Sequence, residues 1–116
     1  MSKSVLYHNP GCSKSRGALE ILRDRGVEFE IVEYLNDPLD RTALGRLVDL
    51  LPGAPADLVR TDKHFASLGL DPDAHQSRES VVELLHDHPR LMQRPVFVRG
   101  GRAVIARPSE KVLDLL

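Results

Sequence analysis

The chain has 116 residues, of which 41% are hydrophobic and 28% are charged. This length suits one domain, residues 1–116, and this composition suits a soluble protein with an ordinary core. The formal net charge of −1 gives no support to nucleic-acid or membrane-surface binding as the main function. The sequence has no long apolar run and no signal-peptide pattern, so we expect neither a membrane span nor secretion.

The first third of the chain has a β-α-β pattern. Residues 4–8 predict a short strand, and the Asn-Pro-Gly of residues 9–11 predicts a turn. Apolar side chains then recur with helical spacing in residues 18–22, and Gly26 is the expected C-cap. Alternating apolar and glutamate residues predict a second strand over residues 27–33. This order favours a parallel strand pair joined by a right-handed crossover.

The middle of the chain has the spacing of helices. A first helix, with apolar residues at i, i+3, i+4 and i+7 from Leu44, ends before the Pro-Gly-Ala-Pro of residues 52–55. A short helical piece follows over residues 55–59. A second long helix runs from residue 78 to about residue 86, with Ser77 as its expected N-cap.

The last part of the chain returns to β structure. Residues 95–98 and 102–105 flank Gly100 and Gly101, which predicts a hairpin because two glycines accept the positive φ angles of a primed turn. A last helix opens near residues 107–110 and carries the apolar residues Val112, Leu115 and Leu116. The complete order predicts an α/β protein with a thioredoxin-like, four-stranded mixed sheet flanked by helices. A helical insertion separates its βαβ and ββα halves.

Cys12 is the only cysteine, so the chain cannot form an internal disulfide. No Cys/His cluster indicates a metal site, because His86 and His88 do not share a helix face and the remaining histidines lack ligand spacing. One free thiol is most simply interpreted as belonging to a cytoplasmic protein.

Cys12 falls where a strand ends and a helix begins. The free amides and the dipole of a helix N-terminus stabilise an anion there, which lowers a thiol pKa. Ser15 and Arg16 lie on the same face of the first turn, where a hydroxyl can hydrogen-bond the sulfur and a guanidinium can add positive potential. The alternative is a buried, inert cysteine. The turn-forming and polar neighbours favour a nucleophile.

Four further residues are candidates by context. His8 either tunes the thiolate or caps the strand end. Arg60, Arg94 and Arg107 are also candidates, although an arginine taken singly is usually a solvated surface charge. Arg94 and Arg107, however, form two Arg-Pro pairs at predicted strand ends, and a planar guanidinium suits bidentate binding of a tetrahedral oxyanion.

Residues 8–16, His-Asn-Pro-Gly-Cys-Ser-Lys-Ser-Arg, resemble the His-Asn-Pro-x-Cys-x-x-Ser-Arg signature of the glutaredoxin-coupled arsenate reductase family. Residues 91–95 and 106–110 resemble its two later Arg-Pro elements, and Arg60 stands at the place of its remaining oxyanion-binding arginine. The resemblance extends, in order and at compatible spacing, over nearly the whole chain.

This resemblance implies a thioredoxin-like fold with a cis Pro95 opposite the thiol. It implies that Cys12 attacks arsenate held by the three arginines, and that glutathione and glutaredoxin resolve the adduct and release arsenite. Glutathione is then a co-substrate, no cofactor is bound, and we expect a monomer. Ser15 stands where the family's redox-sensing regulators have a second cysteine, which argues against that branch.

Two other interpretations remain open at this point. The protein is either a glutathione-dependent thiol reductase for another substrate or a non-catalytic module that binds a protein partner. Convergence of the arginines would separate arsenate reduction from the first alternative. A buried Cys12 with an unperturbed pKa would favour the second.

Overall fold

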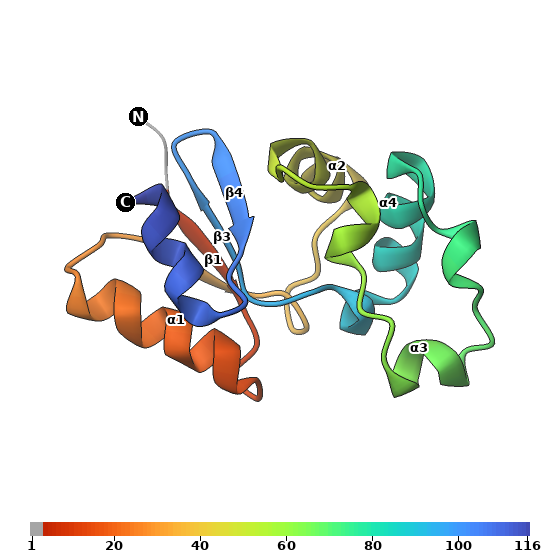
Figure 1. Ribbon diagram of the computed structural model, residues 1–116, viewed down its shortest axis with the longest axis horizontal. Coiled ribbons are helices and arrows are strands. Elements are labelled where there is room, and N and C mark those ends of the chain that lie inside the picture. The colour runs from red at the N-terminus through yellow and green to blue at the C-terminus, as the bar shows by residue number, and fades with distance from the viewer. Residues whose placement is uncertain (1–3) are drawn as a thin grey trace. The chain divides into compact units, whose positions relative to one another are not determined.

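The computed structural model describes residues 4–116, and the chain divides into two compact units (Figure 1). The first, here the sheet unit, consists of the chain up to Asp37 and of Arg94–Leu116. The second, the helical unit, is Pro38–Gln93 and corresponds to the predicted insertion. The expectation of a single domain over residues 1–116 stays a prediction.

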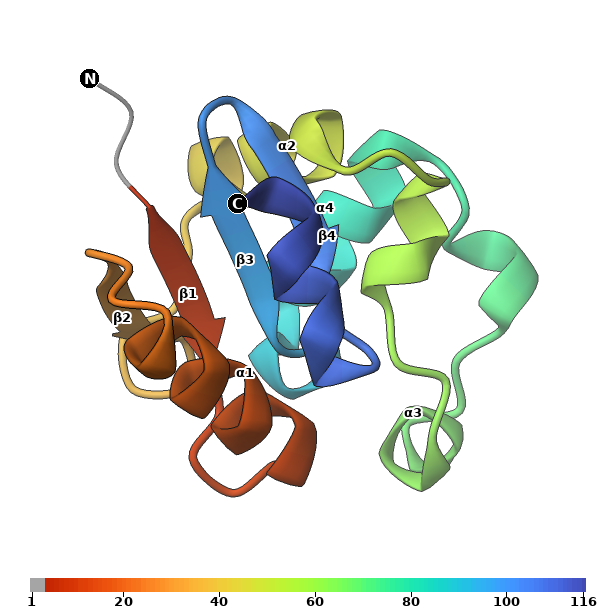
Figure 2. The same cartoon turned by 60° about the vertical axis from the view of Figure 1, so that its left-hand side comes forward.

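The sheet unit contains a mixed four-stranded sheet in the order β2-β1-β3-β4 (Figure 2). Its strands are β1 (Val5–His8), β2 (Glu30–Glu33), β3 (Val96–Arg99) and β4 (Arg102–Ile105). β1 pairs with β2 in parallel, and the β1–β3 and β3–β4 pairs are antiparallel. The predicted parallel pair and the predicted hairpin are therefore confirmed.

α1 (Ser13–Asp24) connects β1 to β2 and packs on one face of the sheet. Leu6 of β1 lies opposite Phe97 of β3, and both side chains are fully buried. They form one core cluster with residues of α1 and of the last helix, η4 (Ser109–Leu115): Ala18, Leu22, Ala106 and Val112. Burial of this apolar surface is the main force that holds both helices on the sheet.

Several boundaries in the sheet unit differ from the sequence-based predictions, among them the start of β1 at Val5 and the range of β3, Val96–Arg99. Arg25 is the C-cap of α1, and Gly26 follows it with φ 66°. β2 begins only at Glu30, because β1 is four residues long and Val5 pairs with Glu30. Leu116 lies beyond η4, which is a 3₁₀ helix, and is exposed.

The turn between β3 and β4 is the predicted one. Gly100 and Gly101 have φ angles of 61° and 76°. Residues with a Cβ rarely adopt two such angles in succession, so the two glycines allow the tight connection that brings β4 back beside β3.

The helical unit is built from short helices around its own apolar core. These are α2 (Arg41–Leu50), η1 (Pro55–Leu58), α3 (Lys63–Ser67), η2 (Pro72–Ala74), α4 (Arg78–Asp87) and η3 (Pro89–Leu91). Ser77 caps α4 by accepting a hydrogen bond from Ser80 N–H, which confirms the predicted cap. α3 was not predicted, because only the Asp62 cap and the buried Phe65 mark it in the sequence. Across residues 4–116, no helix has the length and apolar character needed to cross a membrane.

Candidate active site

Cys12 lies directly after the turn that follows β1, as the N-cap residue of α1. Its N–H donates to the Asn9 carbonyl oxygen at 3.0 Å, and its own carbonyl accepts from Arg16 N–H at 3.0 Å. The side chain is 8% exposed. The thiol is therefore held in a fixed turn at the start of a helix, with little surface open to solvent.

The surroundings of Cys12 lower its pKa. Burial acts in the opposite direction, because it disfavours the thiolate. The backbone N–H groups of Ser15 and Lys14, the charge on Arg94 and a hydrogen bond from Arg107 outweigh it. Arg107 Nη1 lies 3.9 Å from the sulfur. These are the features of an activated thiol rather than of an inert one.

The hairpin register brings Arg94 and Arg107 together. Val96 pairs with Ile105, and Ala106 N–H donates to the Pro95 carbonyl oxygen at 2.9 Å, so the residues just outside the two strands also meet. Arg107 Nη1 donates to the Arg94 carbonyl oxygen at 3.0 Å. The Arg94–Pro95 peptide bond is cis, as predicted, and the Arg107–Pro108 bond is cis as well.

Neither of these arginines is neutralised within its own unit. Among residues 4–37 and 94–116, no carboxylate lies within ion-pair distance of Arg94 or Arg107. Arg94 Nε is buried and has no hydrogen-bond acceptor among the residues described. A thiolate and two guanidiniums without a carboxylate partner form a site that is suited to a small anion.

Ser15 and His8 are joined to each other beside the thiol. Ser15 Oγ lies 2.6 Å from His8 Nδ1 and accepts a 3.0 Å hydrogen bond from Asn9 N–H, and both side chains are buried. Ser15 therefore acts on the sulfur through its backbone N–H, whereas we expected its hydroxyl to do so. The hydroxyl instead anchors the residues at the end of β1.

Burial lowers the pKa of His8, which favours the neutral ring. Glu33 acts in the opposite direction, whereas Arg23 and Arg16 lower the pKa further. Arg16 is exposed, and its Nη1 donates to the Pro10 carbonyl oxygen at 2.9 Å, which stabilises the turn before Cys12. The thiolate-tuning roles of His8 and Arg16 stay predictions.

Arg60 belongs to the helical unit. Its backbone N–H donates to the Leu91 carbonyl oxygen, and its guanidinium forms a 2.8 Å ion pair with Asp62. Its charge is therefore already shared with a carboxylate. Because Arg60 and Cys12 lie in different units, their convergence on one anion stays a prediction.

The geometry has counterparts in known proteins. The sequence profile of the ArsC family matches residues 7–115. This chain belongs to the ArsC family. It is 36% identical over 118 aligned residues to an arsenate reductase from Neisseria meningitidis, and the alignment covers 100% of both chains. It is also 40% identical to the uncharacterized protein YfgD from Escherichia coli strain K12, over 100% of this chain and 99% of that one.

The fold is likewise that of the family. An arsenate reductase structure from Vibrio cholerae superposes with a TM-score of 0.88 at 32% identity, over 99% of this chain and 98% of the other. The predicted thioredoxin-like fold is therefore confirmed. The family suggests a reductase that acts on an oxyanion.

Two residues of this ArsC site were not assigned from the sequence. Tyr34 follows the end of β2 and is 1% exposed, and a hydrogen bond joins its side chain to that of Asn9. Burial raises the pKa of Tyr34, against the effects of Arg94 and Asn9. Asn9 Oδ1 also accepts from Gly11 N–H at 2.9 Å, so Asn9 links this tyrosine to the turn before Cys12. In the sequence only their positions could have identified them. Asn9 follows β1 and Tyr34 follows β2, and the carboxyl ends of adjacent parallel strands meet at one edge of a sheet.

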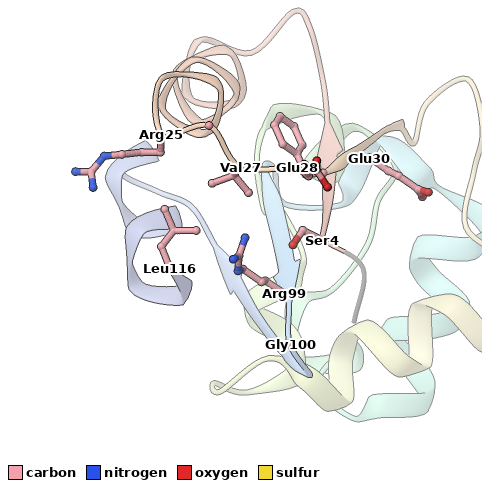
Figure 3. Close-up of a pocket in the computed structure, with 10 residues that line it drawn as sticks. Ser4, Arg25, Val27, Glu28, Glu30, Arg99, Gly100 and Leu116 are labelled. Carbon is pink, nitrogen blue, oxygen red and sulfur yellow. The ribbon is translucent and has the colours of Figure 1, made fainter. Parts of the chain in front are cut away.

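Figure 3 shows a hollow of the sheet unit, with a volume of about 1130 Å³, that Cys12 does not line. Ser4, before β1, and Gly100, after β3, line it, and Figure 3 shows the charged ends of Arg25 and Glu30 pointing to opposite sides. Its lining includes charged side chains of both signs, Arg25, Arg99, Glu28 and Glu30, and no cysteine or histidine. Among residues 4–116, no three metal-ligating side chains gather.

Proposed function

We propose that this protein reduces arsenate to arsenite through a covalent Cys12–arsenic adduct that glutathione and glutaredoxin resolve. One observation carries the proposal. A single free thiol with a lowered pKa lies 3.9 Å from the Arg107 guanidinium and within the field of Arg94, and neither arginine has a carboxylate partner in the sheet unit. The similarity to arsenate reductases supports the choice of anion.

The charges explain why arginines are needed. Arsenate and a thiolate are both negative, and two unit charges 4 Å apart repel by about 4 kcal/mol at an effective dielectric of 20. Arg94 and Arg107 offset this repulsion and also stabilise the charge that develops on oxygen in the transition state. We further propose that Arg60 completes this set as a third oxyanion-binding residue.

In the first step, the Cys12 sulfur attacks arsenic and a sulfur–arsenic bond forms. One arsenate oxygen leaves as water after it accepts two protons, which come from the protonated substrate and from solvent. Arsenic stays pentavalent, so this step needs no reductant. The two guanidiniums hold the remaining oxygens and orient arsenic towards the sulfur.

The reducing electrons come from outside the chain. Glutathione displaces a second oxygen as water and forms its own sulfur–arsenic bond. A glutaredoxin thiolate then attacks the glutathione sulfur, and the electron pair of the broken bond stays on arsenic, which becomes trivalent. The glutaredoxin–glutathione disulfide leaves, and hydrolysis of the Cys12–arsenic bond releases arsenite. A chain with one cysteine requires such external thiols, because it has no resolving cysteine of its own.

This chemistry needs no bound cofactor and predicts a cytoplasmic enzyme, since glutathione and glutaredoxin remain reduced in that compartment. We also propose that the protein is a monomer. The test is arsenate-dependent NADPH consumption in the presence of glutathione, glutathione reductase and glutaredoxin. We expect turnover that requires both thiol components and disappears in Cys12→Ser. A reactive Cys12 without arsenate turnover would instead favour a glutathione-dependent thiol reductase with another substrate.

A further inference from the structure

Ser109, the first residue of η4, makes a hydrogen bond to the beginning of α1. Its hydroxyl donates to the Lys14 carbonyl oxygen over 2.6 Å. Ser109 is 8% exposed, so solvent competes little for this bond. A backbone carbonyl has two lone pairs, so Lys14 can accept from Ser109 and from its own helix together.

Gly17 provides the space for this contact. A Cβ at this position would lie 2.7 Å from Ser109 Oγ and 3.2 Å from Ser109 Cβ. Any other residue would therefore push Ser109 away from α1. Glycine inside a helix is less favourable than alanine, because it loses more conformational freedom on folding. The close approach of Ser109 gives a physical reason for this glycine.

Both ends of the bond are close in sequence to the reacting groups. Ser109 lies two residues after Arg107, whose Nη1 is 3.9 Å from Cys12 Sγ. Lys14 follows Cys12 in the first turn of α1. We infer that Ser109 is a positioning residue, whose bond to α1 holds the Arg107 guanidinium at its working distance from the Cys12 sulfur. Its effect on turnover rests on the proposed function, whereas its effect on the thiol does not.

Apolar packing, not this hydroxyl, keeps η4 on α1. Val112 of η4 and Ala18 and Leu22 of α1 are fully buried in one core cluster. Loss of the Ser109 hydroxyl leaves this cluster intact, so η4 stays docked while the position of Arg107 becomes less defined. Thiol reactivity and thermal stability should therefore respond differently to the same substitution.

The first test is Ser109→Ala, with Ser67→Ala as a control for the loss of a more exposed hydroxyl-to-carbonyl bond. Ser67 lies in the helical unit, and its hydroxyl also donates to a backbone carbonyl, that of His64, at 2.7 Å. The rate of Cys12 alkylation by iodoacetamide is followed against pH, beside thermal unfolding. In Ser109→Ala we expect a higher thiol pKa and alkylation slowed about three- to tenfold below that pKa. We expect no change in the control.

The second test changes the geometry and leaves the hydroxyl present. Gly17→Ala displaces Ser109, so it should slow alkylation as Ser109→Ala does. The double variant Gly17→Ala/Ser109→Gly no longer has the steric clash, but it still lacks the hydrogen bond to Lys14. It should recover the melting temperature lost in Gly17→Ala while alkylation stays slow. If Ser109 has only a structural role, the melting temperature and the alkylation rate should recover together in the double variant. That result would overturn the inference.

Arsenate kinetics separate this inference from the proposed function. If the wild type turns over arsenate, Ser109→Ala should raise KM more than it lowers kcat, because oxyanion binding loses a well-placed guanidinium. If the wild type does not turn over arsenate, the proposed function fails and the alkylation profiles still decide on Ser109. A wild-type alkylation profile in Ser109→Ala or in Gly17→Ala overturns the positioning role.

Discussion

The arginines of the two units are held in different ways. In the helical unit three arginines pair with carboxylates at 2.7–2.8 Å: Arg41 with Glu83, Arg78 with Asp49, and Arg60 with Asp62. In the sheet unit the Arg107 guanidinium donates to a backbone carbonyl, that of Arg94. No carboxylate of residues 4–37 or 94–116 forms an ion pair with the guanidinium of Arg94 or of Arg107. These three arginines are thus neutralised by carboxylates, whereas Arg107 is only oriented by its carbonyl acceptor.

This difference predicts that Arg94 and Arg107 act on an anion more strongly than the carboxylate-paired arginines do. A carbonyl acceptor fixes the direction of a guanidinium without cancelling its charge, so the positive potential remains available to the Cys12 thiolate and to an anion. A carboxylate acceptor fixes the direction and removes the net charge. Exposed pairs of that kind contribute little to stability. The predictions below test whether this distinction determines activity.

The largest effect is expected at the thiol. Cys12→Ser should abolish arsenate turnover, because a serine hydroxyl is not ionised at neutral pH and no other cysteine exists in the chain. The circular dichroism spectrum should stay that of the wild type, since serine also fits the N-cap position of α1. Measurable coupled turnover in this variant would contradict a Cys12 nucleophile.

Arg94→Ala should give the next largest effect. Removal of an oxyanion-stabilising donor typically lowers the rate by about 10²–10³. Arg94→Lys should recover only part of this loss, because an ammonium keeps the charge but not the planar fork. The matched control is Arg41→Ala, which removes an arginine whose Nε is already held by Glu83 at 2.7 Å. Equal kcat/KM values for Arg94→Ala and Arg41→Ala would remove Arg94 from the site.

Much of the fold could be predicted from local sequence patterns. Helical periodicity in α1, two glycines between β3 and β4, and Ser77 before α4 each specify a local geometry without long-range information. The length of β2 could not be predicted, because it depends on the four residues that β1 offers for pairing. α3 has five residues, which is too short for a periodic signal.

The site was predictable where it depends on backbone topology. A hairpin with two glycines at its turn places the residues before β3 and after β4 together, so the convergence of Arg94 and Arg107 follows from the sequence. Side-chain partners were not predictable in the same way. The sequence does not specify a partner for the Ser15 hydroxyl, and its bond to His8 depends on where β1 ends relative to α1. Tyr34 carries no motif of its own.

The pH dependence of Cys12 alkylation should show a smaller effect. Because the folded-state pKa is lowered, the thiolate persists below the ordinary value of about 8.5 and is lost as the pH falls through the folded pKa. Arg107→Ala removes one of the stabilising groups and should move this midpoint upward. Alkylation below the midpoint should then slow by about tenfold or less. A wild-type midpoint at or above 8.5 would contradict an activated thiol.

The smallest effects are expected at Arg60. It is one of the arginines paired with a carboxylate, although the family resemblance implies that it binds oxyanion. If it does so, Asp62 competes with the substrate. Asp62→Asn removes that competition and keeps the cap of α3, where Oδ1 accepts from Phe65 N–H at 3.1 Å, since asparagine caps as well as aspartate. We expect Asp62→Asn to lower the KM for arsenate by about two- to fivefold, an effect that high salt should reduce.

Arg60→Ala should raise KM by a similar factor, against Arg78→Ala as a control from the same unit. Arg78 is likewise held by a carboxylate, Asp49, at 2.7 Å. Arg78→Ala therefore shows the effect of losing an ion pair without losing a proposed substrate contact. Opposite shifts of KM in Asp62→Asn and Arg60→Ala would show that Arg60 binds substrate despite its ion pair. Unchanged KM values in both variants would mean that pairing with a carboxylate marks a structural arginine. The oxyanion would then be held by Arg94 and Arg107 without Arg60.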